Sequence, residues 1–228
     1  MQPPAARHLA VLAAAALFIG GAALDAPALA EDPSSGEIVD ALKPKVKYRA
    51  FDPAQEERES RQADLVKRLQ RERTRAITVE ERDEIATVVK ENELPAIDLE
   101  VFFNFDSSEI TPEALPILKK LGEALSDEKL KGSVFLVAGH TDAKGSDAYN
   151  LSLSDARAKS VQTFLIENFK LDPKQLVALG FGEEQLKNRD NPFSGENRRV
   201  QVVNMASADV AAKASEPAED TAPAEKGE

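Results

Sequence analysis

The chain has 228 residues, of which 40 are acidic and 29 basic, so its formal net charge is −11, and it contains no cysteine. Such an acidic chain is a poor candidate for nucleic-acid binding, because duplex affinity comes largely from Lys and Arg side chains that neutralise phosphates. Without cysteine there is no disulfide framework, so the fold must depend on a hydrophobic core, and the length permits one or two domains.

The N-terminal segment 1–30 has the pattern of a secretory signal peptide. Arg7 precedes an apolar run over 9–24, and small residues at 28–30 form a cleavage site. The apolar run ends at Asp25, short of the roughly 20 apolar residues that a spanning helix needs. We therefore expect the segment to be removed, leaving a mature protein without a transmembrane segment in an exported compartment.

Residues 31–95 are predicted to form a charged, partly helical linker or arm. A thin apolar stripe, too narrow for a well-packed globular core, is formed by Ala63, Val66 and Leu69. Thr78 and Glu81 have the spacing of a capping box before a short helix. The basic run at 67–75 could contact an anionic polymer or a lipid, but charge patterning favours a solvated helix face.

Residues 96–205 are predicted to form the globular domain. Strand-like segments occur at 96–105, 132–140, 175–183 and 196–205. One helix is expected to begin after Thr111, with Pro112 at its first position, and a second to span 147–169. Strands alternating with helices indicate helices packed on one sheet, in a domain of ordinary size.

The C-terminal segment 206–228 has a different composition. It contains six acidic residues and two lysines among Ala, Pro and Ser, with almost no large apolar side chain. A segment of this kind cannot bury enough apolar surface to offset the entropy of ordering. We therefore expect an acidic tail that remains disordered.

No catalytic or metal-binding set of residues stands out. Besides His8 in the signal segment, the chain has only His140, and without cysteine a zinc site would need carboxylates at a spacing that is not found. Neither a Gly-x-Ser-x-Gly elbow nor a phosphate-binding glycine loop occurs. We expect no enzyme, no catalytic residue, no metal and no cofactor, with His140 a packed or hydrogen-bonding residue at a strand end.

Two charges stand out in the stretch "GHTDAKGSDAYNLSLSDARAKSV", at 139–161. Asp142 follows the second predicted strand, where a side chain clears the sheet edge and can face a ligand. Arg157 is four residues from both Leu153 and Val161, so it lies near the core-facing side of its helix and must find a partner or reach a cleft. The glycine-containing loop between the two charges could bring them to one place.

An Asp and an Arg side chain at the opening of one cleft could bind a zwitterion. The carboxylate would accept an ammonium group, and the guanidinium would hold a carboxylate through two parallel hydrogen bonds. The alternative is a plain ion pair between Asp142 and Arg157 that orients the loop. The residues alone leave these two possibilities equal.

That stretch, together with "FFNFDSSEITPEA", "LVALGFGEEQ" and "NPFSGENRRVQV", resembles the motifs of the outer membrane protein A-like (OmpA-like) peptidoglycan-binding domain, over 96–205. The resemblance implies an α+β fold, a βαβαβ sandwich with helices packed on one mixed four-stranded sheet, here preceded by the charged helical arm. Family members bind the meso-diaminopimelate residue of the peptidoglycan stem peptide without covalent chemistry and have no enzymatic activity.

The resemblance also implies a set of ligand-binding positions. These are Asp142, Arg157, Asp106, Phe105, Thr141, Asn150, Leu153 and Arg198. Asp142 and Arg157 match the pair that holds diaminopimelate, and Phe105 and Asp106 match the loop that helps line the pocket. The other positions line or support the pocket. For Arg198 a structural salt bridge is an equal alternative, and Asn150 could also be a helix-start residue.

The expected partner is therefore peptidoglycan, and the expected location is the periplasm, at the outer membrane or the cell wall. Two other functions stay open. The chain could be a wall-processing enzyme that uses His140 and nearby carboxylates, or an adaptor whose arm, at 50–93, recruits another envelope protein.

Overall fold

The computed structural model describes residues 32–44, 52–71 and 77–205 of the chain. The segments predicted to be a signal peptide and an acidic tail, 1–30 and 206–228, lie outside the described residues, as does the end of the basic run at 67–75. Within the described ranges, no helix is both long enough and apolar enough to cross a membrane.

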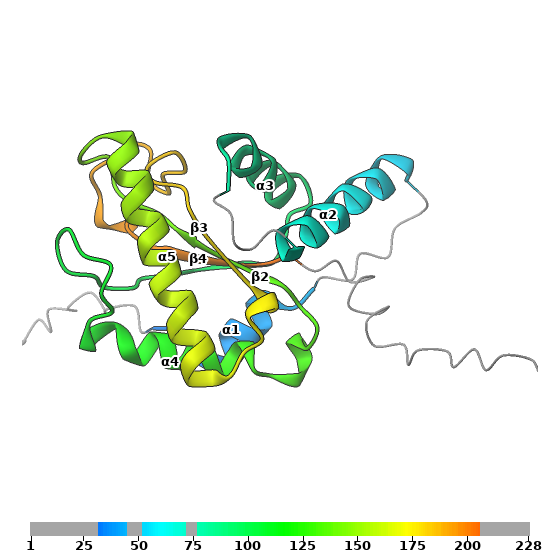
Figure 1. The fold of residues 1–228 in the computed structure, drawn as a ribbon, viewed down its shortest axis with the longest axis horizontal. Coiled ribbons are helices and arrows are strands. Elements are labelled where there is room, and N and C mark those ends of the chain that lie inside the picture. Colours follow the sequence, from blue (N-terminus) through cyan, green and yellow to red (C-terminus); the bar gives the residue numbers. More distant parts are fainter. Residues whose placement is uncertain (1–31, 45–51, 72–76, 206–228) are drawn as a thin grey trace, which may run out of the picture. The chain divides into compact units, whose positions relative to one another are not determined.

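The described residues form five α-helices and four strands. The helices are α1 (Ser35–Leu42), α2 (Pro53–Arg71), α3 (Val79–Glu91), α4 (Leu115–Leu125) and α5 (Asp147–Phe169). The strands are β1 (Ala96–Leu99), β2 (Phe135–Gly139), β3 (Leu176–Gly180) and β4 (Val200–Asn204) (Figure 1). The helix predicted over 147–169 is confirmed, and so is the capping box before α3, in which Thr78 and Glu81 cap each other's backbone.

The four strands form one mixed sheet in the order β1-β4-β2-β3. Strand β4 is antiparallel to both of its neighbours, whereas β2 and β3 run parallel. The predicted fold class, α+β with helices on one mixed four-stranded sheet, is confirmed. The first strand is shorter than predicted, because its pairing with β4 ends at Leu99 and the apolar residues after it leave the sheet.

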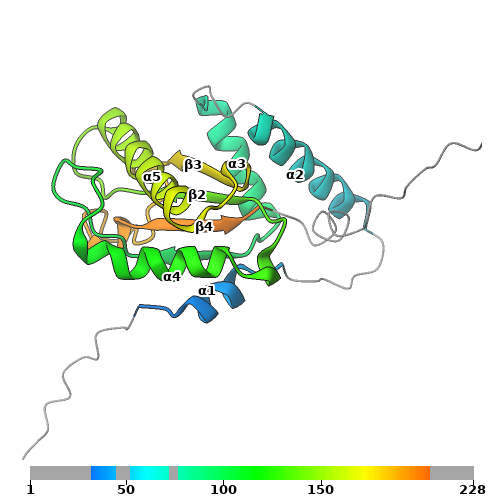
Figure 2. The same ribbon diagram turned by 60° about the horizontal axis from the view of Figure 1, so that its bottom comes forward.

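One hydrophobic core fills the space between one sheet face and helices α1, α4 and α5. Its fully buried side chains include Ile38, Leu42, Leu118, Leu121, Val137, Val161 and Leu165. In Figure 2, α1 and α4 lie together, apart from α2 and α3. Because side chains of a strand alternate between the two faces, β2 directs Phe135 and Val137 into this core and Leu136 and Ala138 to the opposite face.

A second core lies on that opposite face and is covered by α2 and α3. Leu65, Val66 and Leu69 of α2 and Ile85 and Val88 of α3 pack with apolar side chains of the sheet. The expectation that the stripe of Ala63, Val66 and Leu69 was too thin for a packed core was wrong, since Val66 and Leu69 are 6% and 8% exposed. Leu65, which was not counted in the predicted stripe, is 1% exposed and widens it.

Polar contacts fasten the same two helices to the domain. On α3, Arg82 is buried and pairs with Asp155 of α5, and it also donates to the carbonyl of Gly180. On α2, the amide of Gln62 donates to the carbonyl of Met205 at 2.9 Å. Helices α2 and α3 thus pack on the sheet in this structure. The division into an arm at 31–95 and a domain at 96–205 stays a prediction, and so does recruitment of an envelope protein by 50–93.

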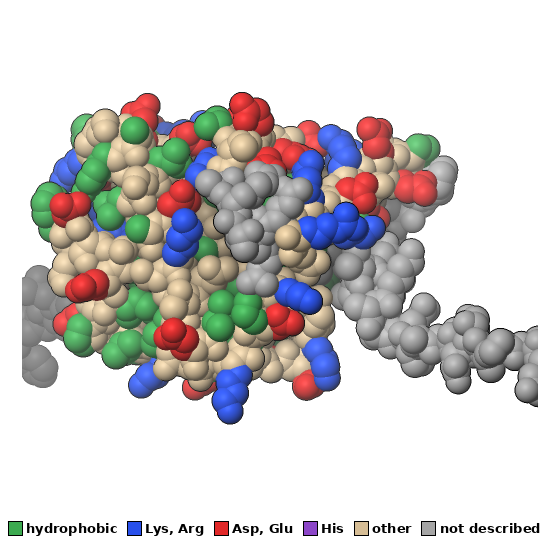
Figure 3. Space-filling view, in the orientation of Figure 1, with side chains coloured by type: hydrophobic (Ala, Val, Ile, Leu, Met, Phe, Trp, Pro, Cys, Tyr) green, Lys and Arg blue, Asp and Glu red, His purple; other side chains and the backbone are tan. Residues whose placement is uncertain are grey.

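The exposed side of α2 and α3 carries charges of both signs. Arg61 lies 3.6 Å from Glu91, and Arg68 lies 2.5 Å from Glu84. Acidic and basic side chains also alternate over the face drawn in Figure 3. The pairing of basic residues with neighbouring acids supports the solvated-face interpretation of the basic run, as far as residue 71.

Helix α5 approaches the sheet unusually closely. Gly139 of β2 and Gly180 of β3 are paired neighbours, and a Cβ on either would overlap the backbone of Ser154 or Asp155. Ser154 is fully buried as a result, while Leu153, predicted for the buried stripe, is only half-buried. The two glycines therefore fix where the first half of α5 rests.

Candidate functional site

The candidate site lies where the parallel strands β2 and β3 end beside the start of α5. Because the carboxyl ends of parallel strands meet at one edge, the residues that follow them are brought together. The backbone N–H of Thr141 donates to the carbonyl of Gly182 at 2.8 Å, which joins the two strand ends. Thr141 and Asp142, both buried, follow β2 directly at this edge.

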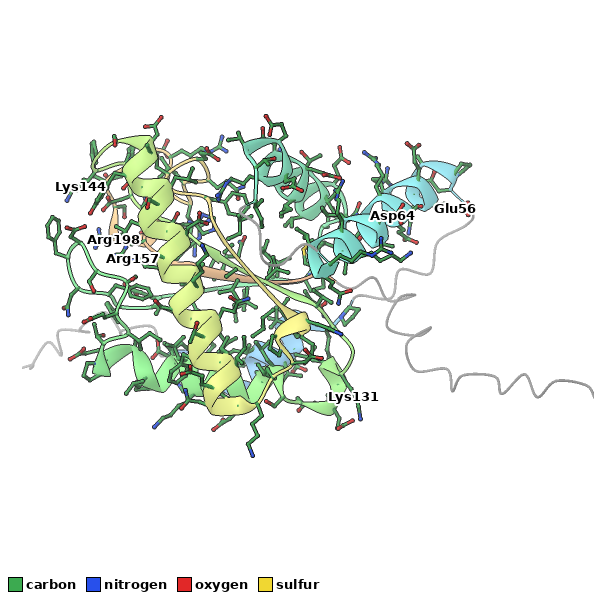
Figure 4. All side chains as sticks on the ribbon, in the orientation of Figure 1. Glu56, Asp64, Lys131, Lys144, Arg157 and Arg198 are labelled. Carbon is green, nitrogen blue, oxygen red and sulfur yellow. The ribbon has the colours of Figure 1, made fainter. Side chains whose placement is uncertain are left out.

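Asp142 is a buried carboxylate, 6% exposed, with both oxygens engaged. Its Oδ1 accepts a hydrogen bond from the backbone N–H of Lys144 at 3.1 Å, and its Oδ2 accepts one from Nη1 of Arg198 at 2.7 Å. Charge-assisted bonds of this length are strong and orient the carboxylate. Figure 4 shows Lys144, Arg157 and Arg198 at the same end of the molecule, beside the start of α5.

Arg157 reaches inward from α5 and is 9% exposed, as its helical position predicted. Its Nε donates to the carbonyl of Ser107 at 3.0 Å and its Nη2 to that of Asn104 at 3.3 Å. The guanidinium also lies 4.9 Å from the ring centre of Phe103. Burial lowers the pKa of Arg157, and the nearby charge of Arg198 lowers it further. This arginine therefore holds the loop after β1.

The plain ion pair between Asp142 and Arg157 does not form among the described residues. Asp142 pairs with Arg198 instead, while Arg157 bonds to backbone carbonyls. Arg198, whose side chain is 51% exposed, thus has the structural salt bridge that was one of its two predicted roles. The structure brings all three side chains beside the first half of α5, but in the described part of the chain Arg157 has no carboxylate within 4 Å.

The loop after β1 carries Phe105 and Asp106 at its tip. Asp106 has a left-handed backbone conformation, with φ of 52°, and its Oδ1 accepts a hydrogen bond from the hydroxyl of Tyr149 at 2.7 Å. Phe105 is 97% exposed, so it packs against none of the other predicted site residues. The hydrogen bond to Asp106 raises the pKa of Tyr149. Tyr149 and Arg157 together tie this loop to α5.

Asn150 is buried behind Asp142 and supports the loop that follows β2. Its amide donates to the backbone carbonyl of Asp142 at 3.2 Å and to the carboxylate of Glu183. The helix-start role falls to Ser146, which caps α5 by accepting from the N–H of Tyr149. Asn150 therefore positions the backbone of Asp142 rather than capping the helix.

Tyr149 and Glu183 were not predicted as site residues. Glu183 is the last residue of the third predicted strand, but the sequence did not show that the end of this strand lies beside the end of the second. Tyr149 gave no signal either, since its partner Asp106 is 43 residues away. A tyrosine in the first turn of a predicted helix is ordinarily a surface residue.

His140 is a packed residue, as favoured from the sequence. It is 2% exposed, and its ring stacks on Phe181 with centres 5.6 Å apart. Burial, with a smaller contribution from Arg199, lowers the pKa of His140 to about 3, so the imidazole is neutral at physiological pH. In the described ranges no group of three or more His, Cys, Asp or Glu side chains could hold a metal ion.

Fold and site together define an α+β domain in which charged side chains gather near the ends of its two parallel strands. The model of the OmpA family matches residues 102–201, a segment that contains every predicted site residue. This part of the chain is therefore an OmpA-like domain.

Three relatives illustrate the similarity. The chain is 34% identical over 103 residues to the peptidoglycan-associated lipoprotein of Pseudomonas putida, covering 44% of this chain and 60% of that protein. It is 31% identical over 112 residues to outer membrane porin F of Pseudomonas aeruginosa, with 48% and 31% covered. Outer membrane protein A of Escherichia coli O157:H7 is 38% identical over 96 residues, with 42% and 26% covered.

Among solved structures, the peptidoglycan-associated lipoprotein from Burkholderia pseudomallei is 28% identical, with a TM-score of 0.39, covering 45% of this chain and 86% of that one. The chain spans 60% of the length of the Pseudomonas putida lipoprotein and smaller shares of the porin and of outer membrane protein A.

Proposed function

We propose that this protein is a non-enzymatic module that binds peptidoglycan in the cell envelope, at the periplasmic side of the outer membrane or on the cell wall. The OmpA-like domain at 102–201 supports this function. Further support comes from a relative, 34% identical over 103 residues, whose name is peptidoglycan-associated lipoprotein.

The ligand group we propose is the side chain of meso-diaminopimelate in the stem peptide. The observation that carries this proposal is that Asp142 and Arg157, both nine-tenths buried and opposite in charge, lie at one end of α5 without pairing to each other. Asp142 accepts the ammonium group of the ligand, and Arg157 takes its carboxylate. Such a site selects a zwitterion over a singly charged group.

Ligand binding requires a rearrangement at Asp142, since Arg198 occupies its Oδ2. Arg198 is half-exposed, so its guanidinium can swing outward and meet the ligand without a large desolvation cost. Asn150 and Thr141 keep the backbone of Asp142 in place, whereas Phe105, Asp106 and Leu153 form the rim. The proposed site thus consists of one charged pair that binds the ligand and of further residues that position this pair or form the rim.

Sedimentation with purified sacculi tests the proposal. Asp142→Ala and Arg157→Ala should each abolish binding while the fold is retained, because losing one partner of a buried charge pair typically costs 2–5 kcal/mol. Lys159→Ala and Glu167→Ala, at exposed positions of α5, are matched controls that should bind like the wild type. If both site variants sediment like the wild type, the site assignment is wrong.

The chemistry of the stem peptide can be tested separately. Sacculi whose stem peptides carry lysine in place of diaminopimelate lack the side-chain carboxylate that Arg157 is proposed to bind. They should bind at least tenfold more weakly, since a lost charged hydrogen bond costs about 1.5–3 kcal/mol. Equal binding to both wall types would leave peptidoglycan binding standing and exclude diaminopimelate as the recognised group. Incubation with muropeptides should release no cleavage product.

A further inference from the structure

Strands β1 and β4 separate at the end of the sheet that lies near the candidate site. Pairing of β1 with β4 ends at Leu99 and Val200, while β2 remains bonded to the chain before β4 through the N–H of His140 and the carbonyl of Arg199. After β1 the chain turns away, and its next strand-like contact is Phe103 with Ile110. A cavity of about 130 Å³ lies between residues 100–103 and the ends of β2 and β4.

The lining of this cavity is rich in positive charge. Arg157, Arg198 and Arg199 line it, together with His140, and Glu100 is the one carboxylate among the lining side chains. Glu100 is solvent-exposed, whereas His140 and the guanidinium of Arg199 are at least nine-tenths buried. The buried part of the wall is therefore cationic and contains no acid.

Carboxylates near the wall only partly balance these charges. Asp142 pairs with Arg198 at the mouth. Arg199 shares Asp98 with Lys187, at 3.1 and 3.2 Å, and these two cations hold the pKa of Asp98 below its ordinary value, although burial alone would raise it. Arg157 has no carboxylate partner among the described residues. This buried guanidinium therefore has no direct ion pair, although the charges of Asp142 and Asp106 act on it from farther away.

Buried polar atoms of the wall also lack hydrogen-bond partners. Arg199 uses Nε for Asp98 and Nη2 for the carbonyl of Gln185, but its Nη1 has no partner within the described residues. Both ring nitrogens of His140 are likewise buried without a hydrogen-bond partner among the described residues. A buried donor without a partner costs about 1–3 kcal/mol, so groups of this kind ordinarily have a ligand or an ordered water.

We propose that this cavity is a subsite for a small carboxylate-class anion, held by Arg199 and His140 at its closed end and by Arg157 at its mouth. Its volume is about that of four water molecules in the liquid, enough for an acetate-sized group. The guanidinium groups supply charge and paired donors, and the neutral imidazole supplies one N–H. The source is either a free anion or a second carboxylate of the proposed peptide ligand.

Titration of the full chain with sodium acetate, followed by amide chemical shifts, tests the free-anion source. The amides of Val101, Gly139 and Val200, which surround the cavity, should shift and saturate. His140→Phe keeps the aromatic stack on Phe181 but removes the ring nitrogens, and it should weaken acetate binding at least tenfold. Arg199→Gln should do the same.

Arg189→Gln is the matched control, because this exposed arginine carries the same charge outside the cavity. It should bind acetate like the wild type. If the wild type shows no saturable shift with acetate or with the peptide, or if both cavity variants bind like the wild type, the subsite does not exist.

Binding of a diaminopimelate tripeptide distinguishes the two sources of the anion. Only this part of the experiment rests on the proposed function. At acetate ten times above its Kd, peptide affinity should fall about tenfold if a peptide carboxylate occupies the subsite, and stay unchanged if the subsite takes free anions. Saturable acetate shifts in a protein that does not sediment with sacculi would leave the subsite standing and overturn wall binding.

Discussion

Arg82 of α3 donates to both carboxylate oxygens of Asp155 on α5, at 3.3 and 3.0 Å, and Asp155 in turn accepts from the backbone N–H of Gly180 in β3. One buried guanidinium thus joins a helix of the N-terminal segment to the helix and the strand that carry the site. Asp155 precedes Arg157 by only two residues. The N-terminal helices therefore contribute to the placement of α5.

Arg82→Met should destabilise the protein by about 3 kcal/mol, because it leaves Asp155 without its charged partner. Urea unfolding measures this loss. Lys90→Met removes a positive charge from an exposed position of the same helix and should change stability by less than about 0.5 kcal/mol. Equal effects of the two substitutions would show that the Arg82 pair does not hold α3 to the domain.

Leu65→Ala should cost about 2–5 kcal/mol, since Leu65 is 1% exposed and the substitution leaves a cavity between α2 and the sheet. Val79→Ala, at a position 60% exposed, should be nearly neutral in the same urea unfolding experiment. A neutral Leu65→Ala would mean that α2 is not part of the core in solution.

Gly139→Ala and Gly180→Ala should each destabilise the protein by several kcal/mol, because the added methyl group would overlap the backbone of α5 and push the helix off the sheet. Gly36→Ala is the control, since a Cβ there would meet only the Ser34 hydroxyl, at an ordinary contact distance of 4.0 Å. It should raise stability by about 0.5–1 kcal/mol. Thermal unfolding of the three variants measures both directions of change.

Acid should destabilise the protein partly through His140. The pKa of His140 is about 3 in the fold, because the ring is buried, whereas an unfolded histidine titrates near 6.5. Between these pH values the unfolded chain binds a proton that the folded one does not, so the free energy of unfolding should fall with decreasing pH, by at most about 1.4 kcal/mol per pH unit.

His140→Phe should make this pH dependence shallower between pH 6.5 and 4 than it is in the wild type, in urea unfolding without acetate buffer. Carboxylates such as Asp98 titrate in both proteins, so the difference between the two slopes isolates the histidine. Parallel slopes would contradict the burial of a neutral imidazole.

Features set by local chemistry were predictable from the sequence. The bounds of α5 were expected because apolar residues recur at helical spacing, and in the structure Ser146 caps its start. The first strand was predicted too long, since "VFFNF" has strand composition although residues from 100 onward leave β4. Composition cannot show where a partner strand ends.

Features set by distant partners were not predictable. The burial of Leu65 depends on a sheet formed mainly from residues beyond 130. The choice of Arg198 rather than Arg157 as the partner of Asp142 depends on where a segment 56 residues away comes to lie. The spacing of apolar residues along the helix correctly predicted that Arg157 points inward. Only the folded structure shows that its guanidinium donates to backbone carbonyls.

The sheet order has a consequence for synthesis of the chain. Strand β4 comes last in the sequence yet lies between β1 and β2. As the ribosome releases the protein from its amino terminus, β1 therefore has no neighbour until residues 200–204 emerge, about 100 residues later. Pairings this far apart in sequence make folding slow. A premature stop before residue 200 would therefore leave β1 without a neighbouring strand and only the β2–β3 pair of the sheet.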